Sequence, residues 1–217
     1  MIKNILIAGA LSLVSLSSQA VDMEYKGFYQ RLDLINDNEL DQITMAFYLV
    51  DYQTRDRCEL SKATMLAKDM SAMDIDIAAD GELLVPYSED LYDKFAFLRV
   101  EQAKPRQNCT LQMQIQSKDK TKTEYSYAEL ALLTAQMQDL VDGFGSFLWF
   151  MMPNVAGLHI SLTSTDDIAF IADDLNTGLN CTDNKCNLAV DMDNESTNKA
   201  ISFAPAPMVI SPWIADD

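Results

Sequence analysis

The sequence has 217 residues and a formal net charge of −17, and about half of its residues are hydrophobic. This length suits one moderate domain or two small ones, with a sizeable core. So acidic a surface repels nucleic acids and anionic lipid headgroups, and we therefore expect no nucleic-acid partner. Solubility is the simplest explanation of the charge, and cation buffering or a basic partner are the alternatives.

The N-terminus has the pattern of a cleavable signal peptide. Lys3 gives it a basic start, an apolar stretch follows from residue 5 to 16, and Ser18 and Ala20 are small residues at positions −3 and −1 of a cut after Ala20. The apolar stretch is shorter than the roughly 20 residues that a membrane-spanning helix needs. No cysteine lies near the cut, so lipoprotein processing is not expected. The mature chain then has a charge of −18, because Lys3 is lost from −17 without any acidic residue.

The four cysteines are expected to form two disulfide bonds, because the chain is exported to an oxidising compartment. Three pairings are possible, and we favour Cys58–Cys109 with Cys181–Cys186. In the second pair, Asp183-Asn184 is a natural two-residue hairpin turn, which places the two cysteines at a close, non-hydrogen-bonded strand position. Metal ligation or redox chemistry would favour closer cysteine spacing and more histidines.

The first part of the mature chain is predicted to form short strands. β-branched, aromatic and alternating residues indicate them, and the segment 58–65 would be the hairpin partner of 43–51. Asp80-Gly81 predicts a second hairpin. Such spacing is typical of a sandwich-like β domain, which Cys58–Cys109 would close. The expected strands are 43–51, 58–65, 74–77, 82–86, 95–100 and 109–115.

An amphipathic helix is predicted from about residue 127 to 152. Ser126 and Glu129 form a capping-box pattern at its start, and Pro153-Asn154 stops it. Gly143 and Gly145 weaken its middle, so two shorter helices are the alternative. Its apolar stripe recurs at spacings of three and four residues and comprises Leu130, Leu133, Met137, Leu140, Phe144, Phe147 and Met151.

Strands return after the helix and precede a proline-punctuated tail at 205–213. They are 157–163, 168–171, the disulfide hairpin at 179–190, and 199–203. The predicted fold class is α+β, mainly β, with antiparallel sandwich-like sheets and one central amphipathic helical segment. The charged connector 118–122 suggests a boundary. The expected organisation is a signal peptide at 1–20, an N-terminal β domain at 21–120, and a helix with a C-terminal β unit at 121–217, with packing into one domain left open.

Catalytic motifs are missing from the sequence. The single histidine, His159, alternates with apolar residues and would share a polar strand face with Ser161. No Gly-x-Ser-x-Gly run and no glycine-rich phosphate loop occur. We therefore expect no catalytic, cofactor or metal residue. Acidic turns explain three clusters that lack a complete calcium loop, namely Asp166-Asp167, Asp173-Asp174 and the run Asp191–Glu195.

The segment 143–165 contains no charged residue. A helix buried between sheets is the simplest interpretation. A segment that contacts a lipid or a partner is the second, and a membrane span, interrupted by Pro153-Asn154, is the third. The possible apolar contact residues are Phe144, Phe147, Trp149, Met151 and Met152.

Several runs together resemble a family of exported Gram-negative bacterial proteins, classed as a domain of unknown function. The runs are Gly27–Leu32, Phe47–Asp51, Cys58, Val85–Leu91, Cys109 and Ile210–Ile214. The resemblance implies a periplasmic protein of about this length and transfers no site residue. We expect a soluble, non-enzymatic periplasmic protein without a membrane span in its mature chain, which acts by binding, as an accessory to an envelope partner. The alternatives are a carrier of a lipid or small apolar ligand between helix and sheets, and a carboxylate-dependent hydrolase.

Overall fold

The computed structural model describes residues 20–104, 108–145 and 152–214. Within these ranges the chain is mainly β, and every strand pair is antiparallel. The predicted α+β, mainly β class is therefore confirmed. Apart from Ala20, the predicted signal peptide lies outside the described residues.

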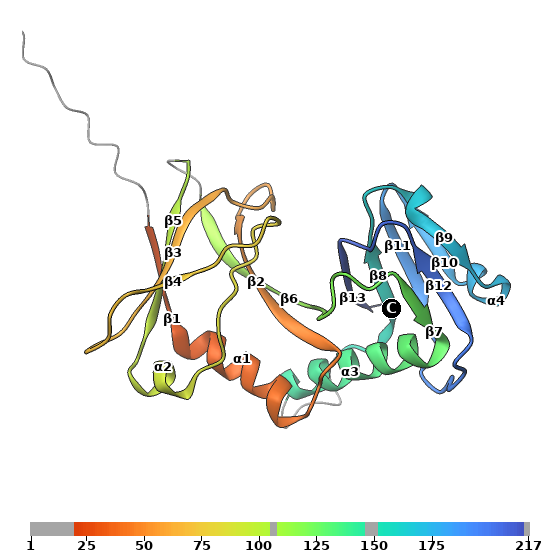
Figure 1. The fold of residues 1–217 in the computed structure, drawn as a ribbon, viewed down its shortest axis with the longest axis horizontal. Helices are drawn as coiled ribbons and strands as arrows, with labels where there is room; N and C mark the ends of the chain where they lie inside the picture. Colours follow the sequence, from red (N-terminus) through yellow and green to blue (C-terminus); the bar gives the residue numbers. More distant parts are fainter. Residues whose placement is uncertain (1–19, 105–107, 146–151, 215–217) are drawn as a thin grey trace, which may run out of the picture.

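The N-terminal lobe, residues 20–117, contains a four-stranded sheet and a separate two-stranded ribbon (Figure 1). The sheet has the order β1-β5-β3-β4, and the ribbon pairs β2 with β6. The elements are β1 (Ala20–Glu24), α1 (Tyr25–Asp37), β2 (Ile43–Asp51), β3 (Leu60–Leu66), β4 (Met73–Ile75), α2 (Glu89–Asp93), β5 (Phe97–Gln102) and β6 (Cys109–Ser117).

Of the two hairpins predicted in this lobe, one is wrong and the other forms only close to its turn. The segment 58–65 was expected to pair with 43–51, but β3 pairs with β4 and β5, and β2 pairs with β6. β2 is buried on both faces, and its backbone needs a hydrogen-bonding partner along its whole length. β6 provides one, because its nine residues pair with all nine residues of β2. The Asp80-Gly81 hairpin forms as a short one, because Ile77 and Leu83 make an antiparallel bridge and the Leu84 N–H donates to the Asp76 carbonyl at 3.0 Å. The predicted strand 82–86 does not extend beyond this bridge, and the Leu83 N–H donates to the Phe47 carbonyl on β2.

Helix α1 was not predicted from the sequence. Its first residue follows Glu24, whose side chain makes no capping hydrogen bond, so the usual local start signal is missing. Tertiary packing holds the helix in place. Phe28 is buried and its ring meets the Phe47 ring of β2 edge-on, with 4.8 Å between centroids.

The C-terminal lobe follows the connector 118–122 and contains two sheets, with the orders β10-β11-β8-β13 and β7-β12-β9. Its predicted disulfide hairpin forms around Asp183-Asn184 in the expected register. The elements are β7 (Glu124–Ser126), α3 (Tyr127–Gly145), β8 (Val155–Ser161), a 3₁₀ turn (Thr165–Asp167), β9 (Ile168–Ile171), α4 (Asp173–Asn176), β10 (Leu179–Thr182), β11 (Lys185–Ala189), β12 (Lys199–Phe203) and β13 (Val209–Ile214).

In this lobe the predicted end of one element lies at residues outside the described ranges, and the predicted tail forms a strand. Helix α3 begins with the predicted capping box of Ser126 and Glu129 but its described part ends at Gly145, and residues 146–151 lie outside the described ranges. The proline-punctuated tail forms strand β13, which pairs with β8 alone. Pro212 is tolerated there because an edge strand does not need every backbone donor.

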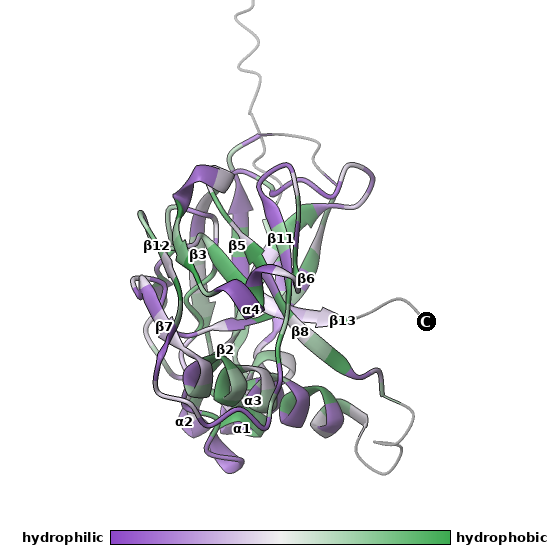
Figure 2. Ribbon diagram, turned by 90° about the vertical axis from the view of Figure 1, so that its right-hand side faces the viewer, coloured by the Kyte–Doolittle hydropathy of each residue, from purple (hydrophilic) through white to green (hydrophobic). Residues whose placement is uncertain are grey.

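The two lobes share one cluster of buried apolar residues. It extends from Tyr25 of α1 through Leu140 of α3 to Ile210 of β13. Figure 2 shows α1 and α3 together at the base of the molecule, with the strands of both lobes above them. The core thus passes through the two helices rather than ending at the connector.

Candidate functional site

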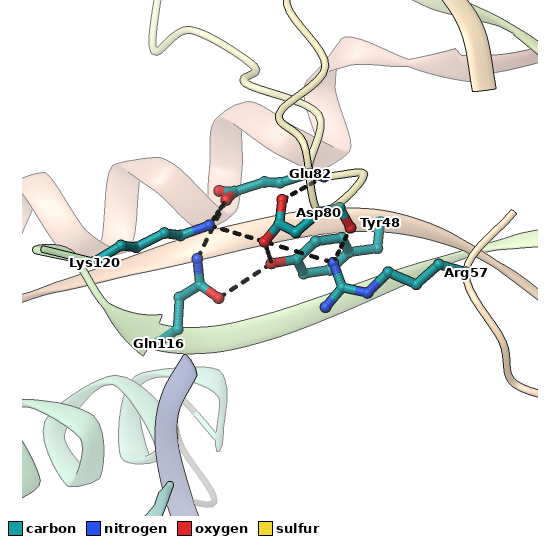
Figure 3. Close-up of polar contacts among 6 residues, drawn as sticks. All are labelled: Tyr48, Arg57, Asp80, Glu82, Gln116 and Lys120. Atoms are coloured by element: carbon teal, nitrogen blue, oxygen red, sulfur yellow. Dashed lines mark hydrogen bonds and ion pairs between the residues drawn. The ribbon is translucent and has the colours of Figure 1, made fainter. Parts of the chain in front are cut away.

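Six polar side chains form a network beside the β2–β6 ribbon (Figure 3). Phe47 and Leu49 of β2 face the main core, whereas Tyr48 faces the opposite side, where Ala46 and Val50 complete a small second cluster. The members of the network are Tyr48, Arg57, Asp80, Glu82, Gln116 and Lys120.

The buried part of this network is a chain of hydrogen bonds. The Tyr48 hydroxyl donates to Gln116 Oε1 at 3.2 Å, and Gln116 Nε2 donates to Glu82 Oε2 at 3.3 Å. All three residues are buried. Lys120 closes the chain, because its ammonium contacts both Glu82 and, at 3.2 Å, Asp80. A buried carboxylate is thereby satisfied by an amide and a cation.

Arg57 covers the exposed side of the network. Its guanidinium lies 3.4 Å from the centroid of the Tyr48 ring, and its Nη1 donates to the Asp80 carbonyl at 2.7 Å. Burial raises the pKa of Tyr48, so the hydroxyl stays protonated and able to donate. Every drawn polar side chain has a partner within the network.

The charges of the network suit a structural role better than acid catalysis. Burial alone would raise the pKa of Asp80, but the Glu82 N–H and the Lys120 ammonium outweigh it and hold that pKa below its ordinary value. The pKa of Lys120 is raised, because its carboxylate partners outweigh the effect of burial. A general acid at neutral pH needs a carboxyl pKa that is raised instead. Because Lys120 lies in the connector, the network fastens the connector to the N-terminal lobe.

His159 lies in a row of polar residues across the C-terminal sheet. Its Nδ1 is 2.7 Å from Asn187 Oδ1, and Ser211 is its partner in register on the other side. Within the described ranges no hydrogen bond joins His159 to Ser211, whose side chain is buried. The geometry therefore orients the imidazole through Asn187 but does not couple it to a nucleophile.

The three predicted acidic clusters lie in turns. Asp167 caps the 3₁₀ turn by accepting from Ser164 N–H, Asp173 and Asp174 begin α4, and Asp191 accepts from Asp193 N–H. In the part of the chain that the structure describes, no three His, Cys, Asp or Glu side chains are arranged to hold a metal ion. The Asp167 and Asp191 carboxylates thus accept from turn backbone groups, whereas the Asp174 carboxylate accepts from the Tyr127 hydroxyl.

The predicted apolar contact segment is described only at its ends. Phe147, Trp149 and Met151 lie outside the described residues, whereas Phe144, at the end of α3, is exposed and Met152 is half-buried. No helix in the described ranges is long and apolar enough to cross a membrane.

A surface that sequence reasoning missed lies beside α2, and we call it the Phe95 surface. It is a pocket of about 470 Å³ where the start of α1, the end of α2 and the start of β5 meet. Its lining combines aromatic rings with three charged residues and comprises Glu24, Lys26, Tyr92, Asp93, Phe95, Ala96 and Phe97.

Phe95 is unusual in both its backbone and its exposure. Helix α2 ends in a Schellman motif, in which the Ala96 N–H donates to the Leu91 carbonyl at 3.0 Å and the Phe95 N–H donates to the Tyr92 carbonyl at 3.1 Å. This motif holds Phe95 in the left-handed region, with φ +51°, where glycine is preferred. The Phe95 side chain is nevertheless 89% exposed. Neither backbone preference nor packing explains a phenylalanine at this position.

A stack of tyrosines supports the back of the Phe95 surface. The Tyr29 ring of α1 stacks on Tyr92 and Tyr87, with centroid separations of 4.5 and 4.9 Å. The Tyr87 hydroxyl donates to Asp33 Oδ1 at 2.6 Å, which raises the pKa of Tyr87. The stack therefore holds α1 and the segment before α2 as one unit, and Tyr92 belongs to both the stack and the pocket.

Local sequence signals for this surface exist but are weak. Ser88 caps α2 by accepting from the Leu91 N–H, and Glu89 and Asp90 are acidic residues in its first turn. The alternation of 95–100 instead predicted a strand that begins at Phe95. Strand β5 begins two residues later, so Phe95 belongs to the helix end.

The chain belongs to the family described as "Protein of unknown function (DUF2987)", whose model matches residues 17–162. The predicted membership of a family of unknown function is thus confirmed. The matched span includes the polar network, the tyrosine stack and the Phe95 surface, and it ends within the C-terminal lobe. No curated protein and no solved structure matches the chain.

Proposed function

We propose that this protein is a non-catalytic periplasmic binding protein that contacts an envelope partner through the Phe95 surface. The observation that carries the proposal is Phe95 itself, a 89% exposed phenylalanine in a backbone conformation that favours glycine. A left-handed conformation costs a non-glycine residue about 1–2 kcal/mol. An exposed ring also forgoes about 2 kcal/mol that its burial would contribute. A partner that covers the ring recovers the second of these losses.

The pocket beside Phe95 supports binding rather than mere exposure. Its volume of about 470 Å³ lies within the range of about 300–1,000 Å³ of known ligand pockets. Tyr92 and Phe97 give it aromatic walls, and the tyrosine stack fixes Tyr92 in place. Aromatic anchors in preformed pockets dominate the free energy of many protein interfaces.

The two disulfides support the periplasmic location. Cys58 pairs with Cys109 and Cys181 pairs with Cys186, with no free cysteine in the described residues. Such bonds persist in oxidising compartments. The proposed signal peptide is tested by the mass of the protein purified from the periplasm. A mature chain that begins at Val21 agrees with it, and a chain that keeps residues 1–20 contradicts it.

Photo-crosslinking in living cells tests the binding role. A photoreactive phenylalanine replaces Phe95 in one variant and Tyr52, a 71% exposed aromatic residue of the same lobe, in a second, control variant. We expect a discrete covalent adduct from position 95 and none from position 52. Adducts of equal yield from both positions, or none from position 95, would contradict the proposal.

A carrier of a small apolar ligand is the second candidate, because a pocket of about 470 Å³ lies between the start of α3 and the segments around β10 and β11. Leu130, Leu175 and Val190 contribute apolar side chains to its lining, and Asp174 contributes a carboxylate. Native mass spectrometry of protein purified from periplasm tests this candidate. A co-purifying apolar adduct would support this candidate, and the mass of the protein without any adduct would contradict it.

A further inference from the structure

We infer that the Phe95 surface and the outer edge of β1 form one docking site for an extended, positively charged polypeptide segment that carries a large apolar side chain. The inference rests on the proposed function and names the chemistry of the partner. Three observations support it: the unpaired edge of β1, the position of the pocket at the end of that edge, and the charges around the pocket.

Strand β1 is the edge of its sheet and presents unpaired backbone groups. It pairs with β5 on one side, and no other described strand lies on its second side. The Tyr25 N–H donates to the Ala96 carbonyl at 2.9 Å. Because hydrogen-bonded and non-hydrogen-bonded pairs alternate in antiparallel sheets, the backbone groups of Asp22 and Glu24 point away from β5. Both residues are exposed, and no described strand pairs with the outward groups of Asp22 or with the Glu24 N–H. The Glu24 carbonyl, at the N-cap of α1, accepts the first hydrogen bond of that helix instead.

The pocket lies where this edge ends. Leu98 and Val100 of β5 face the core, so Phe97 and Arg99 face the other side of the sheet, where Arg99 pairs with Asp22. Phe97 is also the register partner of Glu24 and lines the pocket. A peptide strand added along β1 would therefore place alternate side chains beside Glu24, at the opening of the pocket.

The charges around the pocket favour a cationic partner. Within the described residues, Glu24 and Asp93 have no ion-pair partner, and Lys26 is the one cation that lines the pocket with them. The chain as a whole carries a charge of −17. This field attracts a basic segment over a distance of about one Debye length and repels a second copy of the same chain.

Fluorescence anisotropy with labelled pentapeptides tests the three contributions separately. The probe is Lys-Val-Phe-Val-Lys. A charge-reversed peptide replaces both lysines by glutamates, a second control replaces phenylalanine by serine, and a third carries N-methyl groups that block strand pairing. We expect binding of the probe and at least about tenfold weaker binding of each control, because each control removes one of the three contacts.

Three variants of the protein locate the binding. Phe95→Gly removes the ring and fits the left-handed backbone, and it should weaken probe binding at least about tenfold. Glu24→Gln removes one charge, and Glu24→Pro additionally removes the outward N–H. Glu24 has φ −64°, which proline adopts, so the second change leaves the pairing with β5 intact. We expect the proline variant to bind about fivefold more weakly than the glutamine variant, the value of one hydrogen bond.

The outcomes separate this inference from the proposed function. Equal binding of the probe to Phe95→Gly and the native protein would overturn the docking site. So would equal binding of the N-methylated peptide, or binding of the charge-reversed one. If the probe fails to bind while position 95 still crosslinks to a partner in cells, the inference is wrong and the proposed function stands. If position 95 does not crosslink, the proposed function is wrong.

Discussion

The two lobes are both built from antiparallel strands and each contains one disulfide, yet different kinds of interaction hold them together. Cys58–Cys109 joins residues 51 positions apart, whereas Cys181–Cys186 closes a hairpin over a separation of 5. The N-terminal lobe also depends on the β2–β6 pairing and on a polar network assembled from four separate segments. The lobes thus differ in the reach of their disulfides and in the polar network, whereas both contain long-range strand pairs, β2–β6 in the one and β7–β12 in the other.

The largest expected effect comes from removal of the long-range disulfide. The double substitution of Cys58 and Cys109 by alanine should lower the free energy of unfolding by about 4 kcal/mol, because a loop of this length gains much entropy in the unfolded chain. Urea denaturation followed by circular dichroism measures it. A loss below that of the other disulfide would contradict the comparison of the lobes.

The short-range disulfide should contribute less. Replacement of Cys181 and Cys186 by alanine is expected to lower the free energy of unfolding by about 2 kcal/mol, because the closed loop is short. The same urea titration measures the change. The Asp183-Asn184 turn remains in place, so hydrogen exchange of the β10–β11 amides should still show protection.

Two lysines of the connector extend the comparison, because Lys120 pairs with a residue of the N-terminal lobe and Lys122 with a residue of α3. Lys120→Met leaves the buried Glu82 carboxylate without its cation and should lower the free energy of unfolding by about 2 kcal/mol. Lys122→Met is the matched control. Its partner Glu129, on α3, is half-exposed, so the loss should stay below about 1 kcal/mol. Equal losses in the two variants would show that burial of Glu82 does not matter.

Phe95→Gly should stabilise the protein, although it is expected to weaken binding. Glycine adopts the left-handed conformation at the end of α2 without strain, so the free energy of unfolding should rise by about 1 kcal/mol. Thermal denaturation measures the rise. A destabilised variant would mean that the exposed ring contributes to the fold, which would remove the main argument for a binding role.

The change in the free energy of unfolding with pH under acidic conditions should depend on Asp80. Its pKa is lowered in the folded state, so its contribution is present above the ordinary value of 3.8 and is lost as the pH falls through the folded pKa. Asp80→Asn should therefore make stability less steeply dependent on pH below about 4. Urea denaturation of the native protein and this variant at a series of acidic pH values measures the difference, and equal slopes would contradict the prediction.

The elements that were predicted correctly from the sequence are specified by residues within or next to the element itself. Strands 43–51, 168–171 and 199–203 match β2, β9 and β12, and the turn chemistry of Asp183-Asn184 gave the register of its hairpin. The start of α3 followed from Ser126 and Glu129. In each case a few neighbouring residues lower the free energy of one local conformation, so the pattern can be read without the rest of the chain.

The candidate site was mostly beyond sequence reasoning. The disulfide pairs were predicted from spacing and alternation, but the Phe95 surface was read as part of a strand. Its pocket needs Glu24 from β1, Tyr92 from α2 and Phe97 from β5, and no sequence window contains all three. The polar network likewise joins Tyr48 to Lys120 across much of the N-terminal lobe.

The sequence by itself therefore determined the mainly β class, the cysteine pairs and the local turns, because these depend on short-range preferences and composition. The tertiary structure alone decided that β2 pairs with β6, that residues 25–37 form a helix, and that Phe95 stands exposed beside a pocket. The physical reason is that burial and long-range pairing contribute more free energy than local preference at these positions. The packing of Phe28 on Phe47 compensates for the weak local helix signal at α1, and the Schellman end of α2 overrides the strand pattern at Phe95.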